Sequence, residues 1–148
     1  MPGISKPKGY HDVTPYLHVV GAAKLIEFMK NVFGAEETER MSLADGVVMH
    51  AEMKIGDSMI MLSEATGKSK PMPAMIYLYV EDVDTTYKKA LDAGAISIKQ
   101  PKNEFYGDRS GGVKDPTGNQ WWISTHIEDL TSDELHQREE EFMKQNHG

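Results

Sequence analysis

The 148-residue sequence contains no cysteine and no apolar run of the ~20 residues that a membrane-spanning helix needs. Without cysteine the protein has neither disulfide bonds nor thiolate chemistry, which is compatible with a reducing compartment. The first twelve residues also lack the apolar segment of a secretory signal. We therefore expect a cytoplasmic protein that has no membrane partner.

Positive charge is also scarce, with 16 Lys and Arg residues against 23 Asp and Glu residues and a formal net charge of −7. A nucleic-acid partner is therefore not expected, because phosphate contacts need a basic face. The sequence also lacks a P-loop, a dinucleotide-binding glycine fingerprint and a Gly-x-Ser-x-Gly elbow. These absences remove the commonest nucleotide-dependent and serine-hydrolase chemistries.

The chain does contain an internal repeat of one order of elements: strand, helix and three strands. Val20 and Val80 each precede an expected helix, and the pair Gly34-Ala35 recurs 60 positions later as Gly94-Ala95. Hydrophobic periodicity and turn residues predict the individual elements. The expected strands are residues 12–20, 37–42, 46–55, 58–63, 75–80, 96–100, 104–114 and 119–125, and the expected helices are 22–33, 83–93 and 131–145.

This pattern predicts an α+β fold in which one domain, residues 1–148, is built from two βαβββ modules. The first module covers about residues 12–63 and the second about 74–126, and the polar stretch 64–73 links them. A capping box beginning at Thr131 opens a charged helical arm over residues 131–146. We expect this arm to dock on the domain or on a second subunit.

Three segments resemble the PhnB-like branch of the vicinal oxygen chelate superfamily, the glyoxalase, bleomycin-resistance and dioxygenase group. They are TPYLHVVGAAKLIEFMKNVFGAEE, VMHAEMKIGDSMIMLSE and YGDRSGGVKDPTGNQWWIS. The resemblance covers residues 12 to about 126. It implies that each module curls into a partial barrel, that the two barrels enclose a cavity, and that the protein forms a homodimer.

The resemblance also implies four positions that hold a divalent metal in related enzymes, and here they are occupied by Thr14, His50, Met75 and Trp122. Only His50 is a strong metal ligand, whereas a catalytic metal usually has three protein ligands. We therefore expect no cofactor at these positions. A divalent metal held instead by His50, Glu52 and His18 is an alternative.

Because side chains alternate along a strand, these four positions predict the other cavity-facing residues. Trp121 is then directed to the core, and Trp122 becomes a candidate wall for a planar ligand. The expected cavity set is Thr14, Tyr16 and His18 on the first strand, Val48, His50, Glu52 and Lys54 on the third, Met75, Tyr77 and Tyr79 on the fifth, and Gln120, Trp122 and Ser124 on the last.

The segment 104–112 gives further candidates. Glu104, Tyr106 and Asp108 share one strand face, and Arg109 lies on the other. Arg109 is a candidate for orienting an anionic or carbonyl oxygen, or it pairs with a nearby carboxylate. The glycines at 111–112 indicate a bulge or a close backbone approach.

Three functions follow from these residues. The first is a dimeric protein that sequesters a planar or aromatic small molecule on Trp122, Tyr77, Tyr79, Met75, Tyr16 and Thr14, with contributions from His50 and Arg109. The second is a lyase, isomerase or dioxygenase, either metal-dependent or using His50, Tyr106 and Arg109 as catalytic groups. The third is a protein-interaction module based on the C-terminal helix.

Overall fold

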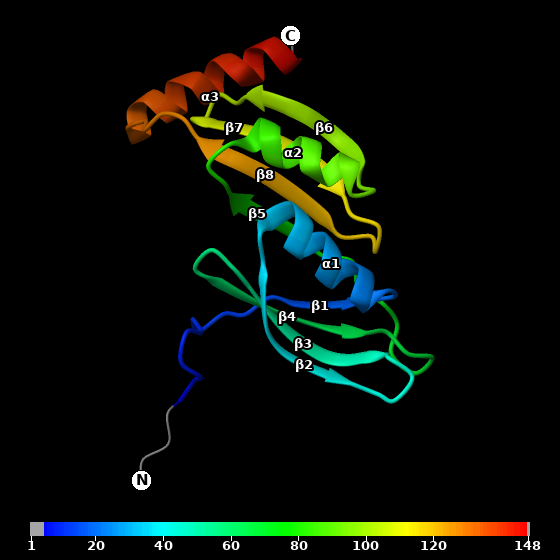
Figure 1. Cartoon of the computed structure of the whole chain (residues 1–148). Helices are drawn as coiled ribbons and strands as arrows, with labels where there is room; N and C mark the ends of the chain where they lie inside the picture. Colours follow the sequence, from blue (N-terminus) through cyan, green and yellow to red (C-terminus); the bar gives the residue numbers. More distant parts are fainter. Residues whose placement is uncertain (1–4, 148) are drawn as a thin grey trace.

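The computed structural model describes residues 5–147 and confirms the α+β fold with two βαβββ modules and a C-terminal helix (Figure 1). None of the helices in these residues has the length and apolar character of a membrane span. The elements are β1 (Tyr16–Val19), α1 (Ala22–Phe33), β2 (Glu36–Ser42), β3 (Val48–Ile55), β4 (Ser58–Glu64), β5 (Met75–Tyr79), α2 (Val83–Asp92), β6 (Ile96–Asn103), β7 (Asp108–Lys114), β8 (Gln120–His126) and α3 (Ser132–His147).

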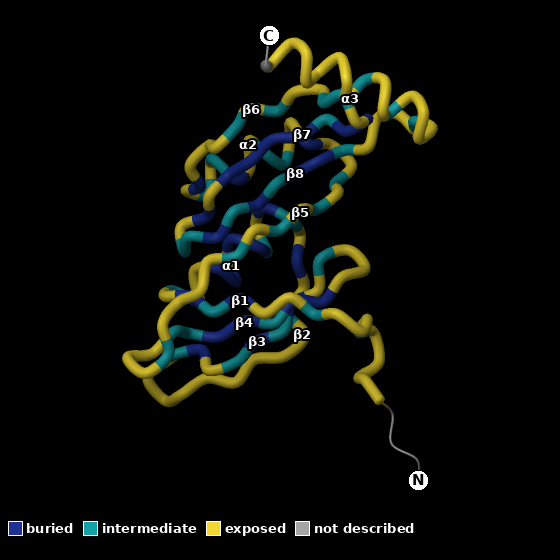
Figure 2. The backbone as a smooth tube through the Cα atoms, turned by 180° about the vertical axis from the view of Figure 1, so that it is seen from behind, coloured by how far each residue is buried: buried dark blue, intermediate teal, exposed yellow. Residues whose placement is uncertain are grey.

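The two modules form two four-stranded sheets of the same topology. The strand order is β1-β4-β3-β2 in the first sheet and β5-β8-β7-β6 in the second. In each sheet the first strand runs parallel to the last, while the other neighbours are antiparallel. Helices α1 and α2 contact each other and cover the same side of the two sheets, so the opposite sides stay open (Figures 1 and 2).

The core lies between the helices and the sheets. Helix α1 buries one face, which includes Leu25, Ile26 and Met29. Gly34 ends this helix with φ 65° and donates its backbone N–H to the carbonyl of Lys30, a conformation that favours glycine. At the other end, the Glu64 carboxylate accepts hydrogen bonds from the first backbone N–H groups, which places a negative charge at the helix N-terminus.

The second module builds its core around Trp121, which is completely buried. The indole Nε1 donates a hydrogen bond of 2.6 Å to Asp115 Oδ2. The other Asp115 oxygen accepts from the backbone and hydroxyl of Thr117 and from the backbone of Asn119. The turn between β7 and β8 and the buried indole therefore fix each other, because a buried polar group needs a partner.

The structure corrects three sequence-based predictions. Strand β7 begins at Asp108 rather than at residue 104, because residues 104–107 form a turn in which Gly107 has φ 96°. Strand β1 begins at Tyr16 rather than at residue 12, so Thr14 lies before it. Val48 lies in the core instead of the open face, because the pairing of β2 with β3 shifts beside it. The prediction for the glycines at 111–112 is confirmed, because the register of β6 shifts opposite them and a Cβ atom at Gly111 would lie 3.1 Å from the backbone of Pro101.

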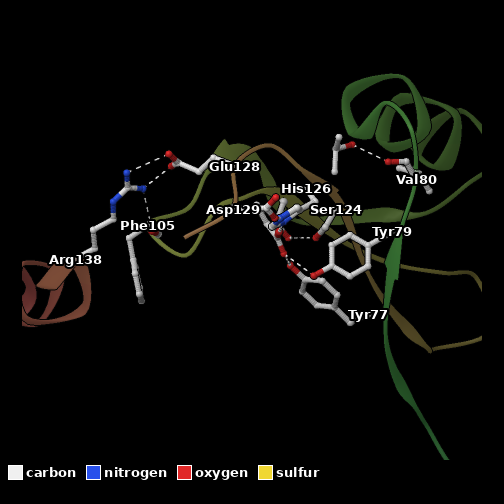
Figure 3. Close-up of polar contacts among 12 residues, drawn as sticks. Tyr77, Tyr79, Val80, Phe105, Ser124, His126, Glu128, Asp129 and Arg138 are labelled. Atoms are coloured by element: carbon white, nitrogen blue, oxygen red, sulfur yellow. Dashed lines mark hydrogen bonds and ion pairs between the residues drawn. The ribbon is translucent and has the colours of Figure 1, made fainter. Parts of the chain in front are cut away.

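Helix α3 docks on the second module through the turn at residues 104–107. The Phe142 ring packs against Phe105 with ring centroids 4.8 Å apart. Arg138 donates to the Phe105 carbonyl and pairs with Glu128 (Figure 3). The N-cap half of the predicted capping box is present, since the backbone N–H of Glu134 donates to Thr131 Oγ1 at 3.1 Å, while the Glu134 carboxylate accepts from the Thr131 hydroxyl. Of the alternatives for this arm, docking on its own domain is the one seen within the described residues.

Candidate ligand-binding site on the second sheet

The open face of the second sheet carries a flat aromatic surface, which we call the platform and define as Trp122, Tyr77 and Met75. Trp122 lies opposite Tyr77 on one side and Gly112 on the other. A Cβ atom at Gly112 would lie 2.9 Å from two ring carbons of Trp122, so the glycine is what lets the indole lie against β7. The side chain is only partly covered and Met75 is exposed, so a planar molecule has access to the surface.

At one end of the platform, the carboxylate of Asp108 gathers side chains from three strands. Asp108 is only 3% exposed. Its Oδ2 accepts hydrogen bonds from the hydroxyls of Tyr77 (2.6 Å) and Tyr79 (3.0 Å), and its Oδ1 lies 2.8 Å from Nδ1 of His126. Nε2 of His126 lies 2.6 Å from Asp129 Oδ1. Figure 3 shows the two tyrosine hydroxyls converging beside His126.

These contacts shift the pKa values of the groups involved. Burial alone would raise the pKa of Asp108, but the hydrogen bonds from Tyr77, His126 and Tyr79 outweigh it and lower the pKa below the ordinary value. The hydrogen bond to Asp108, followed by burial, raises the pKa of Tyr79 to about 12. The hydrogen bonds to Asp108 and then to Asp129 raise the pKa of His126. We call Asp108, Tyr77, Tyr79, His126 and Asp129 the cluster. At neutral pH it contains an ionised Asp108 carboxylate and a neutral Tyr79 phenol.

Sequence reasoning missed Asp108 and His126 as members of this site. Alternation from Trp122 along β8 leads to Ser124 and then to His126, so extending the pattern by one further residue would have found the histidine. Asp108 was placed on a strand face, but no sequence pattern connects that face with the hydroxyls of Tyr77 and Tyr79 on a strand about 30 residues earlier.

The remaining predicted residues of the second module are not all on the platform. Arg109 points to the helix side, where its guanidinium makes two hydrogen bonds with Asp84 of α2 and one with Asn103. Of the two roles expected for Arg109, the structure therefore shows the pairing with a nearby carboxylate. Tyr106 lies in the turn before β7, and burial followed by the neighbouring Tyr77 hydroxyl raises its pKa.

The open face of the first sheet is built differently. His50 lies 3.3 Å from Glu52 through Nε2 and 3.3 Å from the Tyr16 hydroxyl through Nδ1. His18 points elsewhere, because its two ring nitrogens lie within 2.9 Å of the hydroxyls of Ser63 and Ser69. These serine contacts tie β1 to β4 and to the segment that links the modules.

The side chains present do not fit the metal site that the superfamily positions imply. Thr14 precedes β1, Met75 is a weak ligand, and the Trp122 indole has no free lone pair and instead lies on Gly112. The alternative set is not assembled either, since the serine hydroxyls engage His18. Within residues 5–147 no group of three or more His, Asp or Glu side chains is close enough to hold a metal ion.

A cavity of about 800 Å³ lies at the junction of the two modules, beside the free edge of β5. Tyr77 and Tyr79 form part of its lining on the second module, and Pro15 and Ile60 line it on the first. The lining also includes Phe33, Ile76 and Trp121 of the helix side, and of the platform residues it includes Tyr77 but neither Trp122 nor Met75, so this cavity is separate from the open face of the platform.

The model of the Glyoxalase/Bleomycin resistance protein/Dioxygenase superfamily matches residues 15–123, which is most of both modules. The chain belongs to this superfamily. An uncharacterized protein of Mycobacterium tuberculosis is 33% identical over 134 residues, which cover 83% of this chain and 79% of that protein.

Solved structures share the fold. A gene product of Arabidopsis thaliana is 26% identical with a TM-score of 0.61, covering 78% of this chain and 98% of that one. TioX from Micromonospora sp. ML1 is 20% identical, with a TM-score of 0.67 and coverage of 79% and 99%. The PhnB protein from Bacillus cereus is 16% identical, with a TM-score of 0.66 and coverage of 78% and 99%. At such identities the last two establish the fold alone.

Proposed function

We propose that this protein binds a planar or aromatic small molecule on the platform of the second sheet, in the cytoplasm and without a catalytic metal. The observation that carries the proposal is the indole of Trp122, which lies on Gly112 and is only partly covered. An indole held flat by the backbone beneath it offers a stacking surface that loses little conformational entropy when a ligand binds.

The surroundings of the indole support the same function. Tyr77 lies next to Trp122 in the sheet, and its hydroxyl is held by Asp108. Met75 adds an adaptable apolar side chain at the edge. Apolar surface with a few fixed polar groups is the usual composition of a small-molecule site.

The chemistry of the donors supports a site that works without a metal. A Lewis-acid mechanism needs several good ligands around one open position, and the four superfamily positions supply only His50. Metal analysis of purified protein tests this part of the proposal. One bound metal per chain that is lost in His50→Ala would contradict it.

We also propose that two chains pair with the open faces of their sheets toward each other and leave the platform as part of a cavity shared between them. Tyr16, Met75 and Tyr79 are 50%, 68% and 62% exposed, which is unusual for large apolar side chains on one side of a molecule. Contiguous exposed apolar surface marks an interaction site. The mass of the protein in solution tests this pairing, and a monomer at micromolar concentration would contradict it.

Ligand binding is tested by calorimetric titration with a planar probe, naphthalenemethanol, against the wild-type protein and Trp122→Ala. Loss of a stacking contact worth about 0.5–1.5 kcal/mol should weaken binding by up to roughly tenfold. Met61→Ala is the matched control, because Met61 lies opposite Tyr16 as Trp122 lies opposite Tyr77. Equal affinity of the wild-type protein and Trp122→Ala would overturn the proposal.

A further inference from the structure

The orientation of the phenol groups beside the platform decides which ligand groups they can meet. An ionised carboxylate only accepts hydrogen bonds, so the hydroxyls of Tyr77 and Tyr79 must both direct their protons at Asp108 Oδ2. Each phenol oxygen then keeps lone pairs and has no proton left to donate. The oxygens of Tyr77 and Tyr79 at the polar end of the platform therefore accept hydrogen bonds from a ligand and do not offer them.

The net charge of the cluster is negative. Both ring nitrogens of His126 lie within hydrogen-bond distance of carboxylate oxygens, which favours the doubly protonated, positively charged ring. Its charge is opposed by two carboxylates, those of Asp108 and Asp129, which leaves one negative charge on the cluster as a whole.

Two basic side chains of the neighbouring strands are already paired with carboxylates. The guanidinium of Arg109 is engaged by Asp84 on the helix side of the sheet. Lys99 pairs with Glu104. The net charge of −7 adds a field of the same sign over the molecule.

Aromatic rings add a further preference for positive charge. The faces of Trp122 and Tyr77 carry the negative part of the ring quadrupole, which attracts ammonium and other cationic groups. Three features of the site are therefore complementary to the same kind of molecule. They are the flat aromatic surface of the platform, the acceptor oxygens at one end of it and the net negative charge of the cluster.

From these contacts we infer that the preferred ligand of the platform is a planar aromatic compound that bears a positively charged nitrogen with N–H donors. This nitrogen points to the oxygens of Tyr77 and Tyr79. The inference rests on the proposed function, because it names the class of compound for the same site. Neutral and anionic compounds of the same shape bind more weakly.

Three probes that differ in one substituent at the same ring carbon test the inference: naphthylmethylamine, which is cationic, naphthalenemethanol, which is neutral, and naphthoate, which is anionic. Calorimetric titration of the full-length protein at neutral pH should give an affinity for the amine roughly tenfold above that for naphthoate. The neutral alcohol should lie between them.

Two variants assign the preference to the cluster. Asp108→Asn removes the negative charge and should bring the amine and naphthoate affinities close together. Tyr77→Phe keeps the ring and the charge of Asp108, and should weaken the amine while leaving naphthoate unchanged. Thermal unfolding checks that each variant is folded. If Asp108→Asn does not fold, Tyr77→Phe alone tests the role of the cluster.

The possible results separate the two proposals. Equal affinities for the three probes, or a preference for naphthoate, with each probe still weakened by Trp122→Ala, would overturn the charge preference and leave the planar site standing. No effect of Trp122→Ala on any probe would overturn the planar site and the inference together. A preference for the amine that survives both cluster variants would overturn the role of the cluster.

Discussion

The two modules share one topology but carry different groups on their open faces. In the first sheet Tyr16 lies opposite Met61, and in the second Tyr77 lies opposite Trp122, with the same separation of 45 positions in each pair. On the next strand, Glu52 lies beside Met61, whereas Gly112 lies beside Trp122. The glycine makes room for a flat indole, and the glutamate occupies the corresponding place with a charged side chain.

This difference shows how the fold and the site are separated within each sheet. The helix side of both sheets is apolar, with Leu17 and Leu62 in the first and Ile123 in the second, because it must pack against α1 and α2. The open side has no such requirement. The open sides can therefore differ in chemistry between two sheets of the same fold, so one module can carry the platform while the other carries a histidine–glutamate pair.

The largest effect is expected for the buried indole of the second module. Trp121→Ala should reduce the free energy of unfolding by about 3–5 kcal/mol, because it leaves a cavity and removes a donor from the buried Asp115. Ile60→Ala, at the corresponding core position of the first module, should reduce the free energy of unfolding by less. Urea unfolding measures both. A smaller loss of unfolding free energy for Trp121→Ala than for Ile60→Ala would contradict this expected difference between the two cores.

A moderate effect is expected at the position that distinguishes the two open faces. Gly112→Ala places a Cβ within 2.9 Å of the Trp122 ring. The indole must move, and overpacking of this kind costs about 1–3 kcal/mol. Binding of naphthalenemethanol should weaken in parallel.

Glu52→Ala at the corresponding place in the first sheet is the control. Its partly exposed contact with His50 is worth at most about 1 kcal/mol, so both stability and probe binding should change little. Equal effects of the Gly112 and Glu52 changes on probe binding would remove the basis for placing the site on the second sheet alone.

A smaller effect is expected for the C-terminal helix, which contacts the turn of the second module. Phe142→Ala removes the ring packed on Phe105 and should cost about 0.5–1.5 kcal/mol. Amide hydrogen exchange should then become faster in residues 104–107 and stay unchanged in the first sheet. Faster exchange in both sheets would show that the helix stabilises the whole chain.

The smallest effect concerns the pH dependence of the contacts of His126. Its pKa is raised in the folded protein. The stability that it contributes is therefore complete below its ordinary pKa of about 6.5 and is lost as the pH rises through the folded value. The difference in unfolding free energy between wild type and His126→Gln should be larger near about pH 6 than near about pH 9.

Asp129→Asn is the matched control for this measurement, because it removes one of the two carboxylates and should reduce the pH dependence without abolishing it. In the first sheet, His18 contacts serine hydroxyls instead of carboxylates, and His50 lies beside one carboxylate, that of Glu52. A difference for His126→Gln that grows with rising pH would contradict the assigned contacts.

Much of the fold could be predicted from the sequence because its signals are local. The repeated order of strand, helix and three strands, the capping box at Thr131 and the opposite directions of Trp121 and Trp122 all follow from periodicity and turn residues. The start of β7 was missed because residues 104–107 alternate like a strand but close a turn at Gly107. The shift beside Val48 was missed because register depends on the partner strand.

The sequence by itself determined that the four superfamily metal positions hold only one good ligand, His50, since this is a matter of residue type. It also determined that Trp122 faces away from the core, because alternation fixes the face of a strand on which a residue lies. Only the tertiary structure decided which side chains meet on that face. Asp108 joins Tyr77, Tyr79 and His126 because β8 lies between β5 and β7, and neighbours across strands follow from pairing and register rather than from distance along the chain.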